Sequence, residues 1–213
     1  MRVTLTGVGH AFAGQPYLFR GVTETLTAGD LVALTGPSGS GKSTLLGIIA
    51  GWLTPTEGTV EGTRGAEVAW VFQNPYGVAQ RTAVDHVVLP ILARGARRRE
   101  AEQEALELLA TFDLAAVADR PFSALSGGEG QRLMLARAIA RQADLVLVDE
   151  PTAQLDHTSA ESVIRVLHGL AGRGAVVIIA THDPRVRDAC ARVIDLAAYA
   201  RDLFASKGSD APP

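Results

Sequence analysis

The stretch Gly36–Thr44 has the residue types and the spacing needed to bind a phosphate group. It reads GPSGSGKST and stands between the apolar runs Leu31–Leu34 and Leu45–Ile49, which gives the order strand, glycine loop, helix that a phosphate-binding loop requires. Glycines let successive backbone N–H groups curl around an anion, and the following helix directs its positive end toward the same point. An ordinary Gly/Ser turn is the competing interpretation, but it does not require the complete GxxxxGK[ST] spacing. The sequence therefore predicts a nucleoside triphosphate site.

The residues of this loop have separate expected roles. We expect Lys42 to reach the β- and γ-phosphates as a point charge and the Ser43 hydroxyl to ligate Mg²⁺. The backbone of the loop is expected to surround the phosphate oxygens. The predicted nucleotide-binding residues of the loop are Gly36, Ser38, Gly39, Ser40, Gly41, Lys42, Ser43 and Thr44.

Polar side chains follow three further apolar runs, each of which is predicted to be a strand. They are Gln73 after residues 68–72, Asp149 and Glu150 after residues 145–148, and His182 after residues 175–180. Ligands of a parallel sheet bind at the carboxyl ends of its strands. We therefore expect Asp149 to hold Mg²⁺ through water beside Ser43, and Glu150 to polarise a water for in-line attack. Gln73 is expected to reach Mg²⁺ or that water, and His182 to contact the γ-phosphate.

Each of these residues also has a structural interpretation. Gln73 alone is a weak signal and would as readily stabilise a turn, adjacent carboxylates after a strand often form a solvated loop, and a lone histidine is usually structural. The phosphate-binding loop upstream favours function for Asp149, Glu150 and His182. Phe12 is a candidate for stacking on an adenine ring, with packing at a strand edge as an equal alternative.

The segment Leu125–Arg132 reads LSGGEGQR and predicts a second anion site. Ser126 and Glu129 have the spacing of a capping box that opens a helix. A capping box does not need the paired glycines Gly127 and Gly128, which would expose N–H groups at the helix N-terminus. Two phosphate-binding sites for one nucleotide suggest a dimer, in which each copy closes the nucleotide site of the other.

Composition places the chain among globular proteins and argues against a generic nucleic-acid binder. Of 213 residues, 47% are hydrophobic, and 20 Lys+Arg against 23 Asp+Glu give a net charge of −3. The cluster Arg94 and Arg97–Arg99 runs into several glutamates, which is typical of a solvated helix face with charge pairs. Cys190 is the only cysteine, so an internal disulfide is excluded. No apolar run approaches the roughly 18 residues of a membrane span, and the N-terminus lacks the pattern of a secretory signal. We therefore expect a cytosolic protein whose link to a membrane comes through a partner.

The pattern of apolar runs predicts an α/β fold: a P-loop NTPase core with a mainly parallel sheet, N-terminal antiparallel strands and an inserted α-helical subdomain. Residues 1–205 are expected to form one domain, with the α/β core at about 1–73 and 141–200, the helices at about 77–140, and a disordered tail at 206–213. The expected strands are 3–5, 17–26, 31–34, 68–72, 145–148, 175–180 and 193–196, and the expected helices are the one after the phosphate-binding loop with 45–49, then 96–112, 127–140 and 159–170. The unbroken apolar run at 68–72 predicts burial on both faces, and the helical spacing of apolar residues in 96–112 predicts inward-facing Ala105, Leu106, Leu109 and Phe112.

With these motifs in this order, the sequence resembles the ABC ATPases, the nucleotide-binding subunits of ABC transporters. The resemblance covers roughly residues 1–197. Its motifs are the P-loop, the Q-loop residue Gln73, the signature at 125–132, the Walker B stretch LVLVDE at 145–150, the D-loop at 153–156 and the switch His182. The signature LSGG is highly specific, and Ser126 precedes Asp149 by 23 positions, which is typical of the family.

The resemblance implies a head-to-tail dimer, homomeric or heteromeric, with two ATP molecules between P-loops and signature motifs. Ser126, Gly127, Gly128 and Asp156 would contact nucleotide, and Phe12 would occupy the adenine-stacking position. Glu150 would be the general base, and Ser43, Gln73 and Asp149 would hold Mg²⁺. The helical insertion would meet a transmembrane permease near Tyr76–Arg81, so the chain would lie peripherally on the inner face of the cell membrane.

Finer features resemble the lipoprotein-releasing and macrolide-exporter group, notably residues 85–92 followed by an arginine-rich helix. The segment between Gly58 and Val68 is much shorter than is usual in that group, and Gly130 is unusual within the signature. A regulatory ABC ATPase that signals through a non-transporting membrane partner would have the same motifs and is the main alternative. A soluble ABC ATPase that acts on DNA or ribosomes is disfavoured, because Gln73 and Ser126 are only 53 positions apart and leave no room for the long insertions of those families.

Overall fold

The computed structural model describes residues 1–153, 155 and 157–200, without the side chains of His157 and Thr158. Asp156 and the expected tail at 206–213 lie outside these residues. The strands are β1 (Arg2–His10), β2 (Phe19–Thr27), β3 (Leu31–Thr35), β4 (Glu57–Glu61), β5 (Val68–Val71), β6 (Leu145–Asp149), β7 (Val176–Ala180) and β8 (Arg192–Asp195). The helices are α1 (Lys42–Ile49), α2 (Ala83–Ala93), α3 (Arg98–Thr111), α4 (Gly127–Ala140), α5 (His157–Gly172), α6 (Pro184–Ala189) and α7 (Leu196–Ala200), with 3-10 turns η1 (Ala115–Val117) and η2 (Phe122–Ala124).

A parallel sheet with the strand order β5-β6-β7-β3-β8 forms the centre of the molecule. Every residue of β6 and β7 is buried, because helices or a second sheet cover both faces of the central strands, which accounts for their unbroken apolar sequences. All four strand pairs are parallel, so the carboxyl ends of the strands lie at one edge. The predicted mainly parallel α/β core is confirmed.

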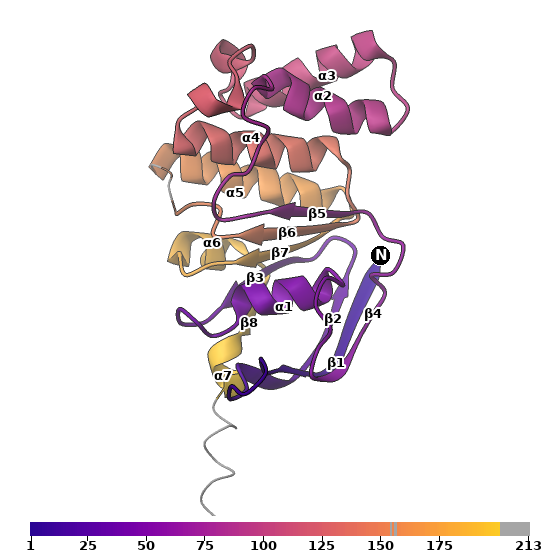
Figure 1. Ribbon diagram of the computed structural model, residues 1–213, viewed down its shortest axis with the longest axis vertical. Helices are drawn as coiled ribbons and strands as arrows, with labels where there is room; N and C mark the ends of the chain where they lie inside the picture. The colour runs from indigo at the N-terminus through magenta and orange to yellow at the C-terminus, as the bar shows by residue number, and fades with distance from the viewer. Residues whose placement is uncertain (154, 156, 201–213) are drawn as a thin grey trace, which may run out of the picture.

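A smaller antiparallel sheet with the order β2-β1-β4 packs beside α1 (Figure 1). The two N-terminal strands confirm the sequence prediction, but both differ from it in their bounds. The sequence did not predict β4, because Glu57–Glu61 is short and polar and resembles a turn. Its pairing with β1, including Leu5 opposite Val60, supplies the tertiary contact that makes it a strand.

The two faces of the parallel sheet pack into separate hydrophobic clusters. Leu145 and Leu147 lie in the cluster with α1 and the antiparallel sheet, whereas Val146 and Val148 lie in the cluster with α2, α3, α4 and α5. This alternation follows from the two-residue period of a strand. Figure 1 shows α4 and α5 stacked on the sheet and α2 and α3 beyond them. The helical insertion therefore shares its core with the sheet, which fixes the start of α4 relative to the strand ends.

The sequence analysis did not predict helix α2, which belongs to the helical region and includes Pro90. Thr82 begins it by accepting a hydrogen bond from the backbone of Asp85 at 3.2 Å, as N-cap residues do. The expected charge pairs on the arginine-rich helix are confirmed: Arg98 pairs with Glu102 one turn later. Among the described residues, no helix is both long enough and apolar enough to cross a membrane.

Three expectations about burial or boundaries were wrong. Strand β5 is at an edge of the sheet and alternates between half-buried and buried residues, so the apolar run at 68–72 reflects an exposed aromatic surface rather than burial on both faces. Leu106 is 48% exposed, because the buried row of α3 continues from Ala105 to Leu109. Leu196 begins α7 instead of ending the last strand.

Candidate functional site

Segments from five parts of the chain meet around a cavity of about 600 Å³ at the carboxyl edge of the parallel sheet. The phosphate-binding loop follows β3, and the other polar residues end β6 or follow β5, β6 and β7, so the parallel topology brings them together. The cavity is lined by Phe12, Leu18, Ser38, Gly39, Gly41, Lys42, Ser43, Thr44, Gln73, Asp149, Glu150 and His182. Most of the predicted site is thus assembled within one chain, and Leu18 is a lining residue that the sequence did not indicate.

The phosphate-binding loop has the backbone geometry of an anion cradle. Gly39 and Gly41 have φ angles of +78° and +93°, in the region that favours glycine. A Cβ atom at Gly41 would lie 2.9 Å from the ring of Phe19, so only glycine lets the loop approach this ring so closely. Lys42 is the first residue of α1, and its Nζ donates to the backbone oxygens of Gly36 at 2.9 Å and Pro37 at 3.2 Å. The ammonium group is thereby held over the loop, beside the helix N-terminus.

Gly36 and Ser40 belong to this loop but do not line the cavity. Ser40 is buried, and its hydroxyl has no hydrogen-bond partner within the part of the chain that the structure describes. A Cβ atom at Gly36 would lie 2.7 Å from that hydroxyl. Both residues therefore support the loop on the side that faces away from the cavity, whereas Ser38, Gly39 and Gly41 line the cavity.

Ser43 and Asp149 form the oxygen-rich end of the cavity. The Ser43 hydroxyl donates to Asp149 Oδ2 at 2.5 Å, which joins the start of α1 to the end of β6. Burial raises the pKa of the Asp149 carboxyl, and the neighbouring Glu150 charge adds to this shift, whereas the Ser43 hydrogen bond and Lys42 oppose it. Mg²⁺ is usually bound by a few protein oxygens together with phosphate oxygens of the substrate. The Ser43 hydroxyl and the Asp149 carboxylate supply such protein oxygens. These residues fit the predicted metal, and Gln73 lines the same cavity.

Glu150 and His182 form a hydrogen-bonded pair across the ends of β6 and β7. His182 Nδ1 lies 2.8 Å from Glu150 Oε1, and because an ionised carboxylate only accepts, the imidazole is the donor. Thr181 Oγ1 donates to Glu150 Oε2 at 3.3 Å. Glu150 has a φ angle of +47°, an uncommon conformation for a residue with a side chain. The surrounding contacts thus hold a buried carboxylate at the cavity while the His182 side chain remains 73% exposed.

Asp183 supports this pair, although nothing in the sequence pattern indicated a role for it. Its carboxylate accepts hydrogen bonds from Thr152 at 2.9 Å and from the backbone and guanidinium of Arg185, and it is the N-cap of α6. These hydrogen bonds, chiefly those from the Arg185 side chain, lower the pKa of Asp183 to about 2. The residue therefore ties the segment after His182 to the segment after Glu150.

We predict that Asp183→Asn destabilises the fold by about 1–2 kcal/mol near neutral pH, because asparagine keeps the cap but loses the charge-assisted hydrogen bonds. A carboxyl group whose pKa is lowered by folding stabilises the folded state above its ordinary pKa. That contribution is lost as the pH falls from about 4 toward 2. Urea unfolding at pH 7 and pH 3.5 measures the difference, which should be smaller at the lower pH. Asp119→Asn, at an exposed aspartate, is the control, and equal losses in the two variants would refute the role of Asp183.

The signature segment lies at the N-terminus of α4 and contributes no lining to the cavity of its own chain. The predicted capping box is present: Ser126 Oγ accepts from the backbone of Glu129 at 3.3 Å, and Glu129 Oε2 accepts from the backbone of Ser126 at 2.7 Å. Gly127 is exposed. A Cβ atom at Gly130 would lie 3.2 Å from Pro75, so the unusual glycine at this position lets α4 pack closely against the segment after Gln73.

A family model described as "ABC transporter" matches residues 19–153. The uncharacterized ABC transporter ATP-binding protein Rv0073 of Mycobacterium tuberculosis is 39% identical over 191 residues, which are 83% of this chain and 58% of the relative. The lipoprotein-releasing system ATP-binding protein LolD of Anaeromyxobacter dehalogenans is 38% identical over 214 residues, which are 91% of this chain and 90% of the relative. The chain thus spans less than two thirds of the mycobacterial relative.

Two solved structures that are similar to this chain are also described as ABC cassettes. The dimeric structure of MJ0796, described as a bacterial ABC transporter cassette, has a TM-score of 0.82 and 31% identity, with 91% of this chain and 93% of that chain covered. A dimeric post-hydrolysis state of the same cassette, bound to ADP and Pi, has a TM-score of 0.81, 32% identity and the same coverage. With its P-loop, signature and strand-end residues in place, this chain belongs to the ABC transporter family and is an ATP-binding domain of the ABC ATPase type.

Proposed function

We propose that the chain hydrolyses ATP as one of two nucleotide-binding subunits that drive a separate transmembrane permease. The observation that carries this proposal is the division of the predicted site. The P-loop, Gln73, Asp149, Glu150 and His182 line one cavity, whereas Ser126 to Gly128 lie outside it at another helix N-terminus. A complete site therefore requires the signature segment of a second chain.

In this proposal, each residue of the site has a separate role in phosphoryl transfer. Lys42 and the backbone N–H groups of the P-loop hold and orient the phosphates, and Ser43, Gln73 and Asp149 hold Mg²⁺, which when bound neutralises charge on the phosphate oxygens. Glu150 takes the proton of the attacking water as general base. The hydrogen bond from His182 orients the Glu150 carboxylate, and the exposed edge of His182 is free to contact the γ-phosphate.

The second subunit completes the site from its signature segment. Ser126, Gly127 and Gly128 present a hydroxyl and backbone N–H groups at the start of a 14-residue helix, where the helix dipole favours an anion. The dimeric state described for MJ0796 supports a dimer here, and the separation of the signature segment from the cavity of its own chain favours a head-to-tail arrangement. Asp156 is assigned to this interface by resemblance alone. Phe12, which is 50% exposed at the cavity, has the room to stack on adenine.

The relatives support a membrane partner. LolD is described as part of a lipoprotein-releasing system, and its similarity covers nearly the whole of both chains. We therefore place this subunit on the cytoplasmic face of the membrane, bound to a permease through the helical region and the segment after Gln73. The proposal includes either a homodimer or a heterodimer of nucleotide-binding subunits.

Capture of the partner tests this function. A tagged Glu150→Gln variant is incubated with detergent-solubilised native membranes, ATP and Mg²⁺, and proteins that co-purify are identified by mass spectrometry. We expect a permease with many membrane spans. A partner with few spans and a large extracellular domain would replace transport with signalling, and recovery of only soluble proteins or nucleic acid would contradict a membrane role.

A further inference from the structure

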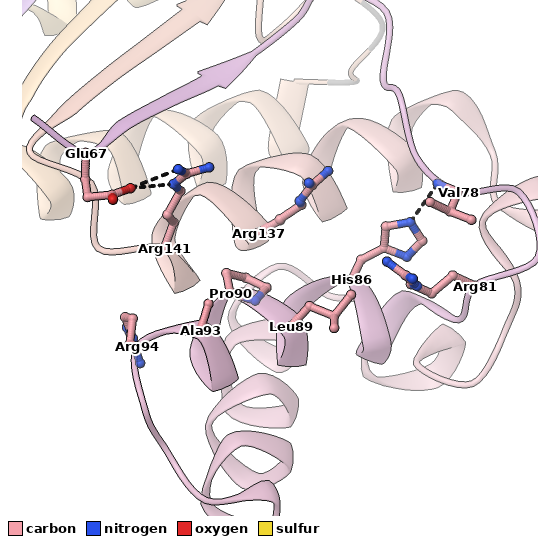
Figure 2. A pocket seen from close by; sticks show the side chains of 10 residues that line it. All are labelled: Glu67, Val78, Arg81, His86, Leu89, Pro90, Ala93, Arg94, Arg137 and Arg141. Atoms are coloured by element: carbon pink, nitrogen blue, oxygen red, sulfur yellow. Dashed lines mark hydrogen bonds and ion pairs between the residues drawn. The ribbon is translucent and has the colours of Figure 1, made fainter. Parts of the chain in front are cut away.

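Two histidines, His10 and His86, are buried in the part of the chain that the structure describes, and they differ in how their ring nitrogens are satisfied. His86 Nε2 accepts a hydrogen bond from the backbone of Val78 at 3.0 Å (Figure 2), and its Nδ1 lies 2.7 Å from the Thr82 carbonyl. These contacts explain His86 as a residue that holds Val78 against the start of α2. His10 has no such explanation, because its Nε2 is buried without a hydrogen-bond partner among the described residues.

The imidazole of His10 is poorly satisfied as a polar group. His10 is the last residue of β1 and is 6% exposed. Its Nδ1 lies 3.4 Å from the Thr56 hydroxyl, which is a long hydrogen bond. A buried nitrogen without a partner costs free energy, because it has lost its hydrogen bonds to water. An apolar side chain would avoid that cost at this position, so another contact of the ring has to account for a histidine here.

That contact is made with Phe12, two residues further along the chain. The centroids of the two rings are 4.9 Å apart, and the ring planes are nearly perpendicular, at 86°. Aromatic rings prefer this edge-to-face geometry. Phe12 lines the nucleotide cavity and is 50% exposed. Its ring thus rests against a buried side chain while about half of its own surface stays open.

The backbone that leads to Phe12 is fixed by Thr56. The Thr56 hydroxyl accepts from the backbone N–H of Ala11 at 3.0 Å and donates to the Ala11 carbonyl at 3.2 Å. The backbone N–H of Thr56 donates to the Gly9 carbonyl at 2.9 Å. These bonds hold the chain up to Ala11, and the contact with His10 then limits the directions that the Phe12 ring can take. A ring outside a strand would otherwise sample several rotamers and lose that freedom when a ligand binds.

We propose that His10 is a positioning residue, which holds the ring of Phe12 in the orientation that stacks on a purine base. This inference rests on the assignment of Phe12 to adenine stacking in the proposed function. Phe12 and Leu18 are the large apolar side chains in the lining of the cavity, so stacking and apolar contact are what they offer a base. A ring that is fixed before nucleotide arrives strengthens the binding of the base and leaves the phosphate contacts unchanged.

Calorimetric titration of the whole chain with two ligands tests this role. One ligand is ATP with Mg²⁺, and the other is inorganic tripolyphosphate with Mg²⁺, which has no base. His10→Leu should weaken ATP binding by about two- to tenfold, the effect expected for one aromatic pair, and should leave tripolyphosphate binding unchanged. His10→Asn, which also lacks the ring, should behave in the same way, whereas His10→Phe should bind ATP like wild type. His168→Leu, at an exposed histidine of α5, is the matched control and should bind both ligands like wild type.

A double variant separates a contact with Phe12 from a general effect on the fold. Phe12→Ala should weaken ATP binding, and adding His10→Leu to it should have no further effect, because the ring that His10 positions is gone. Additive losses in the double variant, or an equal loss of ATP and tripolyphosphate in His10→Leu, would make His10 a structural residue and overturn the inference. Thermal unfolding of each variant shows that it is folded before its binding is compared.

The inference and the assignment on which it rests fail in different ways. If Phe12→Ala loses ATP affinity but His10→Leu and His10→Asn do not, the positioning role of His10 is refuted and the stacking role of Phe12 stands. If Phe12→Ala binds ATP like wild type, the stacking role itself fails, and the role of His10 fails with it.

Discussion

Replacement of Glu150 by glutamine is expected to reduce ATP turnover by about 10²- to 10⁴-fold, the usual range for loss of a general base. The substitution keeps the size of the side chain and its ability to accept from His182, so the geometry of the cavity should persist. ATP affinity should remain close to that of wild type, because the Glu150 carboxylate contributes to the chemical step rather than to the phosphate cradle. Steady-state phosphate release measures turnover, and calorimetry measures binding.

A surface carboxylate provides the control for this substitution. Glu61→Gln removes the same charge from β4, at an exposed residue away from the nucleotide cavity, and should hydrolyse ATP at the wild-type rate. If Glu150→Gln also turned over at that rate, Glu150 would not be the general base. If it lost ATP binding as well as turnover, its role would be structural, through the contacts with Thr181 and His182.

Lys42→Ala is expected to weaken ATP binding by roughly ten- to a hundredfold, which corresponds to the loss of about 1.5–3 kcal/mol for a hydrogen bond to a charged group. In the structure, the Lys42 ammonium is held by the carbonyl oxygens of Gly36 and Pro37, so it is already placed at the loop before nucleotide arrives. Its removal takes away the positive charge that faces the phosphates. Calorimetric titration with ATP and Mg²⁺ measures the change in Kd.

Loss of a positive charge elsewhere should have no such effect. Arg64→Ala, at an exposed residue in the turn after β4, is the matched control and should bind ATP like wild type. An unchanged Kd for Lys42→Ala would contradict the assignment of Gly36–Thr44 as the phosphate-binding loop. An equal loss in both variants would indicate a general electrostatic effect instead of a specific contact.

The sequence predicts well the elements whose patterns are local. Glycine spacing and an adjoining helix indicate the P-loop, buried strands appear as unbroken apolar runs, and polar residues after those runs mark the carboxyl edge of the sheet. From these features alone, Lys42, Ser43, Asp149 and His182 are expected at one nucleotide site, and the structure brings all four to one cavity. The capping box at Ser126 is equally visible in the sequence, because its two residues are three positions apart.

The parts that the sequence did not predict depend on contacts between distant segments. Strand β4 exists because β1 provides its pairing partner, and the support that Thr152 gives to Asp183 joins loops from two different strands. The edge position of β5 follows from the strand order, which no local pattern encodes, so its apolar run wrongly predicts a strand buried on both faces.

Light scattering of Glu150→Gln with ATP and Mg²⁺ measures whether two chains share each nucleotide. We expect a dimer, because slow hydrolysis preserves the ATP that joins the P-loop of one chain to the signature of the other. Adding Ser126→Arg, which places a bulky side chain at the signature helix N-terminus, should return the protein to a monomer. Adding Gln103→Arg instead, at an exposed residue of α3, should leave the dimer intact. A dimer that survives Ser126→Arg would contradict the shared site.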